Sequence, residues 1–586
     1  ISAVIAKKDV VVLMPTGGGK SICYQVPALA LPGVCIVISP LISLMKDQVE
    51  ALKANGVAAA FLNSSQSAEE QQQAETWAQA GKIKLLYVSP EKLLSGNFLN
   101  QLQRMQVNLF AVDEAHCISS WGHDFRPEYT QLARIKQLFP QVPVIALTAT
   151  ADKLTRKDIS QQLNLHHPQV FISSFDRPNL SIDVRPGVKR MENMLRFIES
   201  QGNNSGIIYC LSRDTTENLA QKLQQRGFAA LPYHAGLSAH DRAKTQEAFI
   251  RDDVRIVCAT VAFGMGIDKS NVRFVVHYNL PKNIEGYYQE IGRAGRDGLP
   301  SKTILYYSYA DVMKMRGLLE GSTDKKARLD LQIAKLERMQ QFSEANTCRR
   351  QILLNYFNET LPAPCGNCDV CRMPRQTFDG TVIAQKALSA VARCREKAGA
   401  GLLIDILRGA RNKAVIDGGF DKIKTYGAGR DLSFLDWRDY LQQIINAGLL
   451  EIAYDEHYYL KLTGQSKKVL AGEMEVPLVK FVPQAKTEEA AGTRKRGRRE
   501  EFAETRSDLF EHLRAFRKQL ADRKGLAPDV IFTDTTLREM ASQKPTNKIS
   551  MLSVTGVGAQ KFASFGEAFI NSILEFMSVN QEPSYT

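Results

Sequence analysis

The chain has 586 residues, of which 44% are hydrophobic and 23% charged, and its formal net charge is +13. This length exceeds what a single hydrophobic core organises, so we expect roughly three to five domains. No apolar run approaches the ~20 residues that cross a bilayer, which excludes a membrane-spanning helix. The positive charge favours a polyanionic partner without deciding between nucleic acid and anionic lipid.

Residues 1–316 alternate short β-branched runs with helical stretches. A polar stretch, residues 176–202, separates two sets of such runs. The runs are predicted strands at 10–14, 34–39, 83–89, 109–112 and 144–147, and then at 206–210, 229–233, 256–259, 274–278 and 304–307. Alternation of this kind predicts parallel sheets covered by helices. The fold class is therefore α/β, with two α/β domains in tandem at 1–180 and 181–316.

A glycine-rich loop follows the first predicted strand and precedes a helix. Gly17, Gly18 and Gly19 allow backbone N–H groups to face phosphate oxygens, Lys20 reaches the β and γ phosphates, and Ser21 can bind Mg²⁺. Thr16 belongs to the same predicted ATP site. Met14 stands where the general pattern has glycine, so the match is imperfect, and a glycine loop without a ligand is the alternative.

Two carboxylates follow the predicted strand at 109–112. Asp113 is placed to bind the metal and Glu114 to orient or deprotonate the attacking water. Acidic residues at a strand end also serve as helix N-caps. Lys20 upstream favours the catalytic interpretation.

Two arginines lie close together about 270 residues after the glycine loop. The run 289–298 contains Gln289, Arg293 and Arg296. We predict that Arg296 is an arginine finger that neutralises charge on the γ-phosphoryl group, and that Arg293 is its neighbour on the same nucleotide. Fingers of this type raise rates by about 10³–10⁵. Gln289 is expected to couple contacts with a bound strand to the nucleotide. A nucleotide held between two domains makes hydrolysis move them, so the two motifs together indicate a motor.

Four of the ten cysteines cluster after residue 340. They follow a helical segment, and the last three are separated from one another by only two residues each: Cys348, Cys365, Cys368 and Cys371. Four thiolates with no open position predict a structural Zn²⁺ site. The other cysteines are scattered in mostly apolar surroundings, which suits a reducing cytosol rather than a disulfide framework.

The C-terminal third has a different arrangement of predicted helices and strands. Helices followed by a hairpin, predicted at 450–454 and 457–462 across residues 455–456, suggest a winged helix. Residues 483–501 are basic and without periodicity, which predicts a linker, and a small helical unit follows. The chain begins at Ile1 without a signal pattern, so we expect that N-terminal sequence precedes it.

Ordered motifs across the chain resemble the RecQ family of superfamily 2 DNA helicases. These motifs are Ia at 39–48, Ib at 89–91, the DEAH box at 113–116, III at 148–150 and V at 259–268, which contains Gly266 and Asp268 of the predicted ATP site. Segment 117–129 resembles the aromatic-rich loop that RecQ proteins place after the metal-binding carboxylates. Ile291 departs from the family, which usually has threonine there.

The resemblance implies two RecA-like P-loop domains and further modules with family roles. The expected boundaries are a first RecA-like domain at 1–180, a second at 181–316, a zinc module at 317–378, a winged helix at 379–476, a basic linker at 477–501 and an HRDC domain at 502–580. The aromatic-rich loop is expected to contact DNA through Trp121, His123, Phe125 and Arg126, because bases stack on rings and guanidinium groups pair with phosphate. Aromatic packing in the interdomain core is the alternative. Family members carry an adenine-reading glutamine before the position where Ile1 begins.

The resemblance also implies a function. We expect an ATP-dependent 3′-to-5′ helicase that translocates on single-stranded DNA and unwinds duplex or branched DNA in repair and recombination. Its partners would be DNA, single-strand-binding protein and recombination proteins, in a cytoplasmic, nucleoid-associated location. Two alternatives stay open: an RNA helicase of the same superfamily, and a structure-specific DNA-binding protein with a vestigial ATP site.

Overall fold

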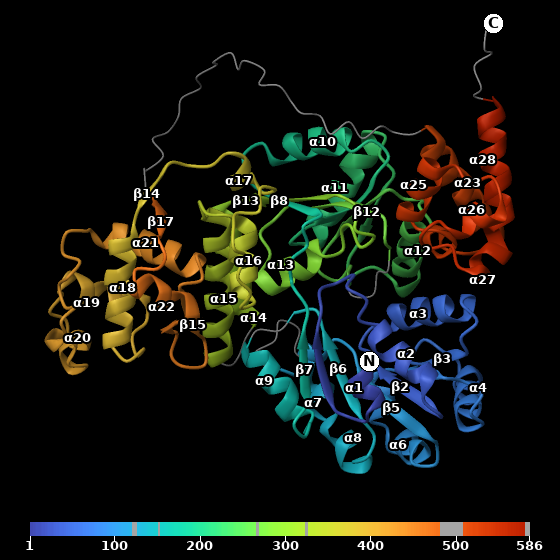
Figure 1. Cartoon of the computed structure of the whole chain (residues 1–586), viewed down its shortest axis with the longest axis horizontal. Helices are drawn as coiled ribbons and strands as arrows, with labels where there is room; N and C mark the ends of the chain where they lie inside the picture. Colours follow the sequence, from blue (N-terminus) through green and yellow to red (C-terminus); the bar gives the residue numbers. More distant parts are fainter. Residues whose placement is uncertain (120–125, 151–152, 265–268, 323–325, 481–507, 580–586) are drawn as a thin grey trace, which may run out of the picture. The chain divides into compact units, whose positions relative to one another are not determined.

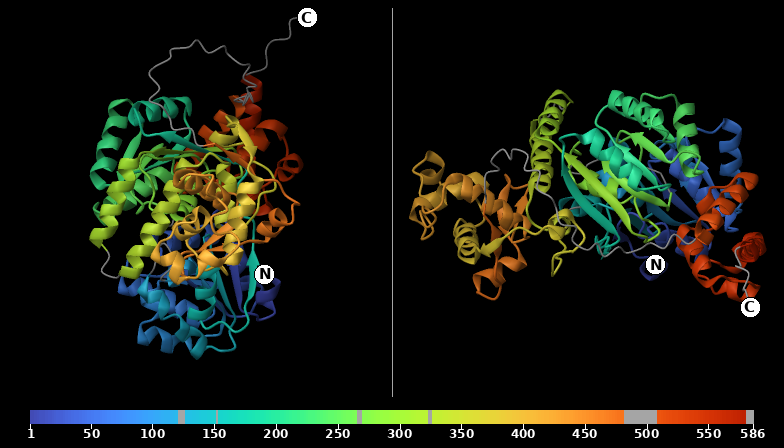
Figure 2. Two further views of the ribbon diagram at one scale, coloured as in Figure 1. Left: turned by 90° about the vertical axis from the view of Figure 1, so that its left-hand side faces the viewer. Right: turned by 90° about the horizontal axis from the view of Figure 1, so that it is seen from above.

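A computed structural model describes residues 1–119, 126–150, 153–264, 269–322, 326–480 and 508–579 (Figures 1 and 2). The chain divides into two compact units, one of residues 1–317 with 506–586 and one of residues 318–505. Among the described residues, no helix combines the length and apolar character needed to cross a membrane.

The first α/β domain is built on a seven-stranded sheet in the order β3-β4-β2-β5-β6-β1-β7, with every neighbouring pair parallel. Its strands are β1 Val10–Leu13, β2 Val34–Ile38, β3 Ala59–Leu62, β4 Leu85–Val88, β5 Val107–Val112, β6 Val144–Thr148 and β7 Gln169–Ile172. Its helices are α1 Ser2–Ile5, α2 Ile22–Ala30, α3 Ile42–Ala54, α4 Ala68–Gln79, α5 Pro90–Leu93, α6 Gly96–Leu102, α7 Pro127–Thr130, α8 Ala133–Leu138 and α9 Lys153–Gln162. β1, β2, β4 and β6 are buried along their whole length, as expected for a parallel sheet with helices on both faces.

The second α/β domain has a six-stranded parallel sheet in the order β10-β11-β9-β12-β13-β8. Its strands are β8 Leu180–Pro186, β9 Ser205–Tyr209, β10 Ala230–Tyr233, β11 Ile256–Ala259, β12 Val272–His277 and β13 Ser301–Tyr307. Its helices are α10 Arg190–Ser200, α11 Arg213–Gln225, α12 Ala239–Ile250, α13 Ile284–Ile291 and α14 Tyr309–Ser322. In the first domain the glycine-rich loop and the two carboxylates follow the carboxyl ends of β1 and β5, where open α/β sheets bind ligands.

A C-terminal helical domain belongs to the same unit. Its helices are α23 Asp508–Lys524, α24 Pro528–Ile531, α25 Asp534–Gln543, α26 Lys548–Leu552, α27 Ala559–Lys561 and α28 Glu567–Val579. The core contains a buried ion pair in which Arg517 Nη2 lies 2.8 Å from Asp534 Oδ1. Lys518 Nζ lies 2.5 Å from Asp253 Oδ1, which ties α23 to the second α/β domain.

The second unit carries the cysteine cluster and the predicted winged helix. Its helices are α15 Lys326–Glu344, α16 Arg349–Tyr356, α17 Asp369–Arg372, α18 Thr381–Arg393, α19 Ala400–Arg408, α20 Lys413–Asp417, α21 Phe434–Asn446 and α22 Gly464–Leu470. Two short antiparallel ribbons complete it, β14 Thr377–Asp379 with β17 Pro477–Val479, and β15 Leu450–Ala453 with β16 Tyr459–Leu462. A capping box between Ser433 and Asp436 starts α21, whose buried face supplies Trp437, Leu441 and Ile444 to the core.

The sequence-based prediction of α/β domains followed by a zinc module, a winged helix and a helical domain is confirmed. Three strands of the two α/β domains, β3, β7 and β8, were not predicted, and neither was the ribbon of β14 and β17. The hairpin turn is also longer than expected, because β15 ends at Ala453 and β16 begins at Tyr459. His457 and Tyr458 in this turn both have left-handed backbones, which a two-residue turn at 455–456 would not explain.

Candidate nucleotide site and zinc centre

The glycine-rich loop joins β1 to α2, as a phosphate-binding loop requires. Gly17 and Gly19 have φ values of 82° and 83°, which favour glycine, and the Gly18 N–H donates to Pro15 O at 3.0 Å. Lys20 Nζ folds back over the loop and donates to Met14 O at 3.3 Å. Burial lowers the pKa of Lys20, while Glu114 and Asp113 act in the opposite direction. A bound phosphate would supply the missing counter-charge.

The two carboxylates lie at the end of β5, close to Lys20. The Asp113 N–H donates to Ile38 O at 2.9 Å, and Asp113 Oδ1 accepts from the Glu114 N–H at 3.0 Å. Burial and the neighbouring Glu114 raise the pKa of Asp113 to about 7, against the effect of Lys20. A bound cation would favour the ionised form.

Glu114 has a left-handed backbone with a φ of 47°, at the start of a 3₁₀ turn at Ala115–Ile118. Its side chain makes no capping hydrogen bond to that turn, so the helix-cap alternative for Glu114 has no support. Glu114 Oε2 lies 3.3 Å from His116 Nδ1, which is also 2.9 Å from Thr148 Oγ1. His116 therefore links Glu114 to Thr148, the last residue of the neighbouring strand β6.

The second α/β domain brings its arginine segment to the glycine-rich loop. A Cβ atom at Gly17 would lie 3.3 Å from Arg296 Cγ, so the base of the Arg296 side chain packs on the loop. Arg293 takes a different position: it is buried and donates to Gly264 O at the end of the described part of motif V. Gln289 lies buried on α13.

The structure describes only some of the remaining residues predicted to bind ATP or DNA. Trp121, His123, Phe125, Gly266 and Asp268 lie outside the described residues. Arg126 is described: its Nη1 donates to Pro40 O at 3.2 Å and its backbone N–H to Cys117 O at 2.9 Å. Arg126 is thus anchored beside motif Ia, which begins at Ser39.

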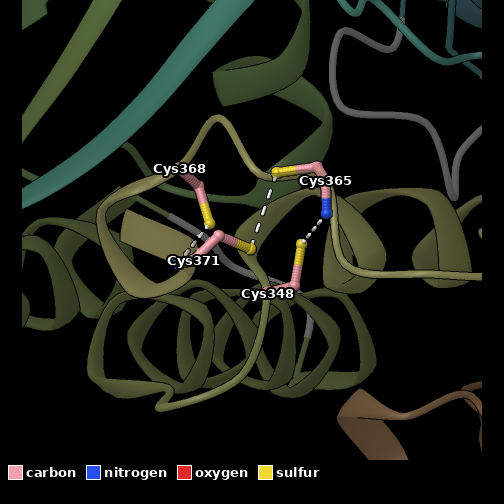
Figure 3. Close-up of side chains that lie close together, drawn as sticks. All are labelled: Cys348, Cys365, Cys368 and Cys371. Carbon is pink, nitrogen blue, oxygen red and sulfur yellow. Dashed lines mark hydrogen bonds between the residues drawn. The ribbon is translucent and has the colours of Figure 1, made fainter. Parts of the chain in front are cut away.

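The four predicted zinc ligands come together in the second unit (Figure 3). Their sulfur atoms all lie within 4.8 Å of one another. Backbone N–H groups donate to sulfur, from Cys365 to Cys348 at 3.3 Å and from Cys371 to Cys368 at 3.4 Å. Hydrogen bonds with Cys348 and Cys365 lower the pKa of Cys368. Four soft sulfur donors gathered in this way fit a tetrahedral Zn²⁺ ion.

Local structure explains why the cysteines meet. Cys348 is the N-cap of α16 and Cys368 the N-cap of α17, where helix dipoles favour negative charge. Arg349 joins these helices through a bidentate pair with Asp369, Nε to Oδ1 at 3.1 Å and Nη2 to Oδ2 at 3.0 Å. The pair holds the two ligand-bearing turns together.

Comparison with known proteins agrees with this arrangement. Family models match in the order of the domains: DEAD/DEAH box helicase at 1–159, helicase conserved C-terminal domain at 189–298, RecQ zinc-binding at 309–372, RQC domain at 374–487 and HRDC domain at 506–573. The ATP-dependent DNA helicase RecQ of Pasteurella multocida is 46% identical over 580 residues, which cover 99% of this chain and 91% of that protein. The chain belongs to the RecQ family of ATP-dependent DNA helicases.

Two further RecQ proteins are similar over nearly the whole chain. The Haemophilus influenzae RecQ is 45% identical, covering 99% of this chain and 93% of that protein. The Bacillus subtilis RecQ is 38% identical, covering 97% of this chain and 93% of that protein. The family resemblance predicted from the sequence is therefore confirmed, and the RecQ zinc-binding match includes all four cysteines.

In the RQC domain, the basic residues lie at the surface, whereas the aromatic residue Trp437 lies in the core. Lys422, Lys424, Arg430 and Arg438 are exposed. Trp437 is fully buried, and its Nε1 donates to Gly429 O at 2.7 Å. The basic side chains are available to a polyanion, whereas Trp437 is a core residue.

Sequence reasoning missed Arg177 and Asn179, in the connector between the RecA-like domains. Both side chains donate to backbone carbonyls of the arginine segment. A polar stretch without periodicity gave no signal for this role, because any residue can supply a carbonyl acceptor.

Proposed function

We propose that the chain is a DNA-stimulated ATPase that moves 3′ to 5′ along single-stranded DNA and unwinds duplex or branched DNA in repair and recombination. One observation carries this proposal: Arg296 of the second RecA-like domain packs on Gly17 of the loop in the first. A nucleotide on that loop would touch both domains. Its hydrolysis would then change their relative position.

The residues of the site have distinct proposed roles. Thr16, Gly17, Gly18, Gly19 and Lys20 would bind the phosphates. Ser21 and Asp113 would hold Mg²⁺, which when bound neutralises phosphate charge. Buried Asp113, with its raised pKa, fits a position that gains a cation.

Glu114 would orient the attacking water or accept its proton. The contact of Glu114 with His116, and of His116 with Thr148, supports a fixed orientation of this carboxylate. Arg296 would stabilise the charge that develops on the γ-phosphoryl group. Arg293 would contact the same nucleotide directly. Alternatively, it would act indirectly by holding motif V in place through its contact with Gly264. Gly266, Asp268 and Gln289 complete the proposed site.

DNA contacts are proposed for two regions. Trp121, His123, Phe125 and Arg126 would bind the translocating strand beside the hydrolytic carboxylates, and the anchored position of Arg126 next to motif Ia supports this. The exposed basic residues of the RQC domain would bind duplex DNA. Single-strand-binding and recombination proteins as partners, and a nucleoid-associated place in the cytoplasm, rest on family resemblance.

The test measures phosphate release with and without single-stranded DNA, and unwinding of matched DNA and RNA duplexes with 3′ or 5′ tails. We expect DNA to stimulate hydrolysis and only 3′-tailed DNA to be unwound efficiently. Lys20→Ala should abolish hydrolysis while DNA binding remains. Absence of stimulation in the wild type would overturn the motor. Preferential unwinding of RNA would instead favour an RNA helicase.

A further inference from the structure

The connector between the two RecA-like domains is attached to the segment that carries the arginines. Tyr288 on α13 donates its hydroxyl to Phe175 O at 2.6 Å. Asn179 Nδ2 donates to Gly295 O at 2.9 Å and to Leu299 O at 3.0 Å. Because β8 begins at Leu180 within the second sheet, this part of the connector moves with the second domain.

Arg177 lies between these two attachment points and contacts both domains. Its Nη2 donates to Ala294 O at 3.0 Å and Gly295 O at 2.8 Å, and its Nη1 lies 3.4 Å from Gly292 O. The same Nη1 donates to Thr16 O, in the phosphate loop of the first domain, at 2.6 Å. The planar fork of a guanidinium group, with five fixed donors, suits such divergent carbonyls better than an ammonium group would.

Carbonyl acceptors favour the charged guanidinium of Arg177, whereas burial and the nearby Arg296 disfavour it. Helix α13 ends at Ile291 with Gly292 as its C-cap, so Gly292 O lies at the negative end of the helix dipole. Burial lowers the pKa of Arg177, and Arg296 adds like-charge repulsion. Two guanidinium groups are therefore held near one another beside the phosphate loop, where a polyphosphate would compensate both charges.

We propose that Arg177 is a positioning residue that fixes the arginine-finger segment against the phosphate loop when the two domains are closed. Its bonds to Ala294 and Gly295 hold the two residues that immediately precede Arg296, while its bond to Thr16 sets their position relative to the phosphates. On opening, the bond to Thr16 breaks and the others travel with the second domain. This inference rests on the proposed role of Arg296 as the finger.

The test compares Arg177→Gln and Arg177→Lys with the wild type in single-turnover and steady-state ATP hydrolysis at saturating single-stranded DNA. We expect Arg177→Gln to lower kcat about 10- to 100-fold, since small misplacements of catalytic groups cost that much. The KM for ATP should change less than about threefold, because the lost interaction acts in the transition state. Arg177→Lys, which keeps the charge but not the fork, should fall between them.

Arg196→Gln is the matched control. Arg196 is exposed on α10 of the same domain, and its Nη2 donates to Asn193 Oδ1 at 2.9 Å. This variant should keep wild-type turnover. If Arg177→Gln fails to fold, as judged by circular dichroism and thermal melting, the comparison rests on Arg177→Lys.

A double-mutant cycle with Arg296→Ala separates positioning from general support of the fold. Arg296→Ala alone should lower kcat about 10³-fold or more. In that background Arg177→Gln should lower kcat by less than about threefold further, because residues acting through one another are not additive. Full wild-type turnover of Arg296→Ala would refute the finger and this inference with it. If Arg296→Ala lowers kcat but Arg177→Gln does not, only the positioning role is refuted. The same holds if the kcat losses of the two single variants multiply in the double variant.

Discussion

Gly17 and Arg296 lie so close that a Cβ atom at Gly17 would come within 3.3 Å of Arg296 Cγ and 3.4 Å of its Cα. The contact joins the phosphate loop of one domain to the finger segment of the other. We expect it to break when the two domains separate.

We predict that Gly17→Ala lowers DNA-stimulated ATP turnover by about tenfold or more, because the new methyl group displaces Arg296 as well as straining a backbone at φ 82°. Steady-state phosphate release measures this effect. Gly81→Ala is the control, since Gly81 also has a positive φ, 66°, but nothing within 4 Å of its added Cβ. Equal turnover in the two variants would contradict a collision at the interdomain contact.

A second prediction concerns the buried pair of Asp252 and Lys269, whose Oδ1 and Nζ atoms are 2.6 Å apart. Lys269 is only 2% exposed, so Asp252→Asn leaves a buried cation unpaired and should destabilise the second domain by about 3–5 kcal/mol. Asp253→Asn, next to it but 51% exposed, should cost less than about 1 kcal/mol. Hydrogen exchange of β11 and β12 would report both losses. Equal protection in both variants would argue against the pair.

The same pair predicts a pH dependence. Burial raises the pKa of Asp252, but Lys269 outweighs it and lowers the pKa to about 2. A depressed pKa stabilises the fold above the unfolded value of about 4 and loses that contribution as pH falls through the folded value. The stability difference between wild type and Asp252→Asn should therefore shrink between about pH 4 and 2, as acid titration of hydrogen exchange would show. A difference that stays constant over this window would mean that folding does not lower the pKa of Asp252.

A third prediction concerns the zinc centre. Chelation should unfold the segment around Cys348 to Cys371, because binding to structural zinc sites contributes about 10–16 kcal/mol. Cys368→Ser should lose zinc, as elemental mass spectrometry would detect. Cys394→Ser, at a cysteine buried in the RQC core and outside the cluster, should retain it. Zinc retained by Cys368→Ser would point to a different ligand set.

A fourth prediction tests the RQC surface. Replacing Lys422 and Lys424 by alanine should weaken duplex binding and reduce the salt slope of the logarithm of the binding constant by about 1 to 2, as expected when phosphate contacts are lost. Fluorescence anisotropy across a salt series measures both quantities. The control is the exposed pair Lys467 and Lys468 on α22, which removes the same charge from the same domain. Identical losses for the two pairs would indicate general charge attraction only.

Within the two α/β domains, the strands that the sequence did not predict are all edge strands. β3, β7 and β8 each end a sheet, where one side lacks a partner and apolar patterning weakens. β3 is alanine-rich, while β8 carries Asp183 and Arg185 within its run, so neither has the β-branched character of the central strands. The central strands and the zinc ligands were predictable because local composition and short spacing determine them.

Roles that depend on tertiary contacts could not be predicted. Trp437, among basic residues, has the sequence context of a DNA-contacting aromatic, yet it fills the core of its domain and donates to Gly429 O. Arg177 resembles any connector arginine until folding places the carbonyls of Thr16, Ala294 and Gly295 around it. The positions of these acceptors come from two domains, and no local pattern encodes them.

The zinc cluster also has a redox consequence. Cys365 Sγ and Cys371 Sγ lie 3.9 Å apart, with two more thiols close by. While a cation is bound, the sulfur lone pairs are coordinated to it and react less readily with oxidants. After the cation leaves, the same closeness lets an oxidant convert pairs of these thiols into disulfides. Oxidative stress would then convert a reversible loss of metal into a lasting one, and recovery of the enzyme would require a reductant before it required zinc.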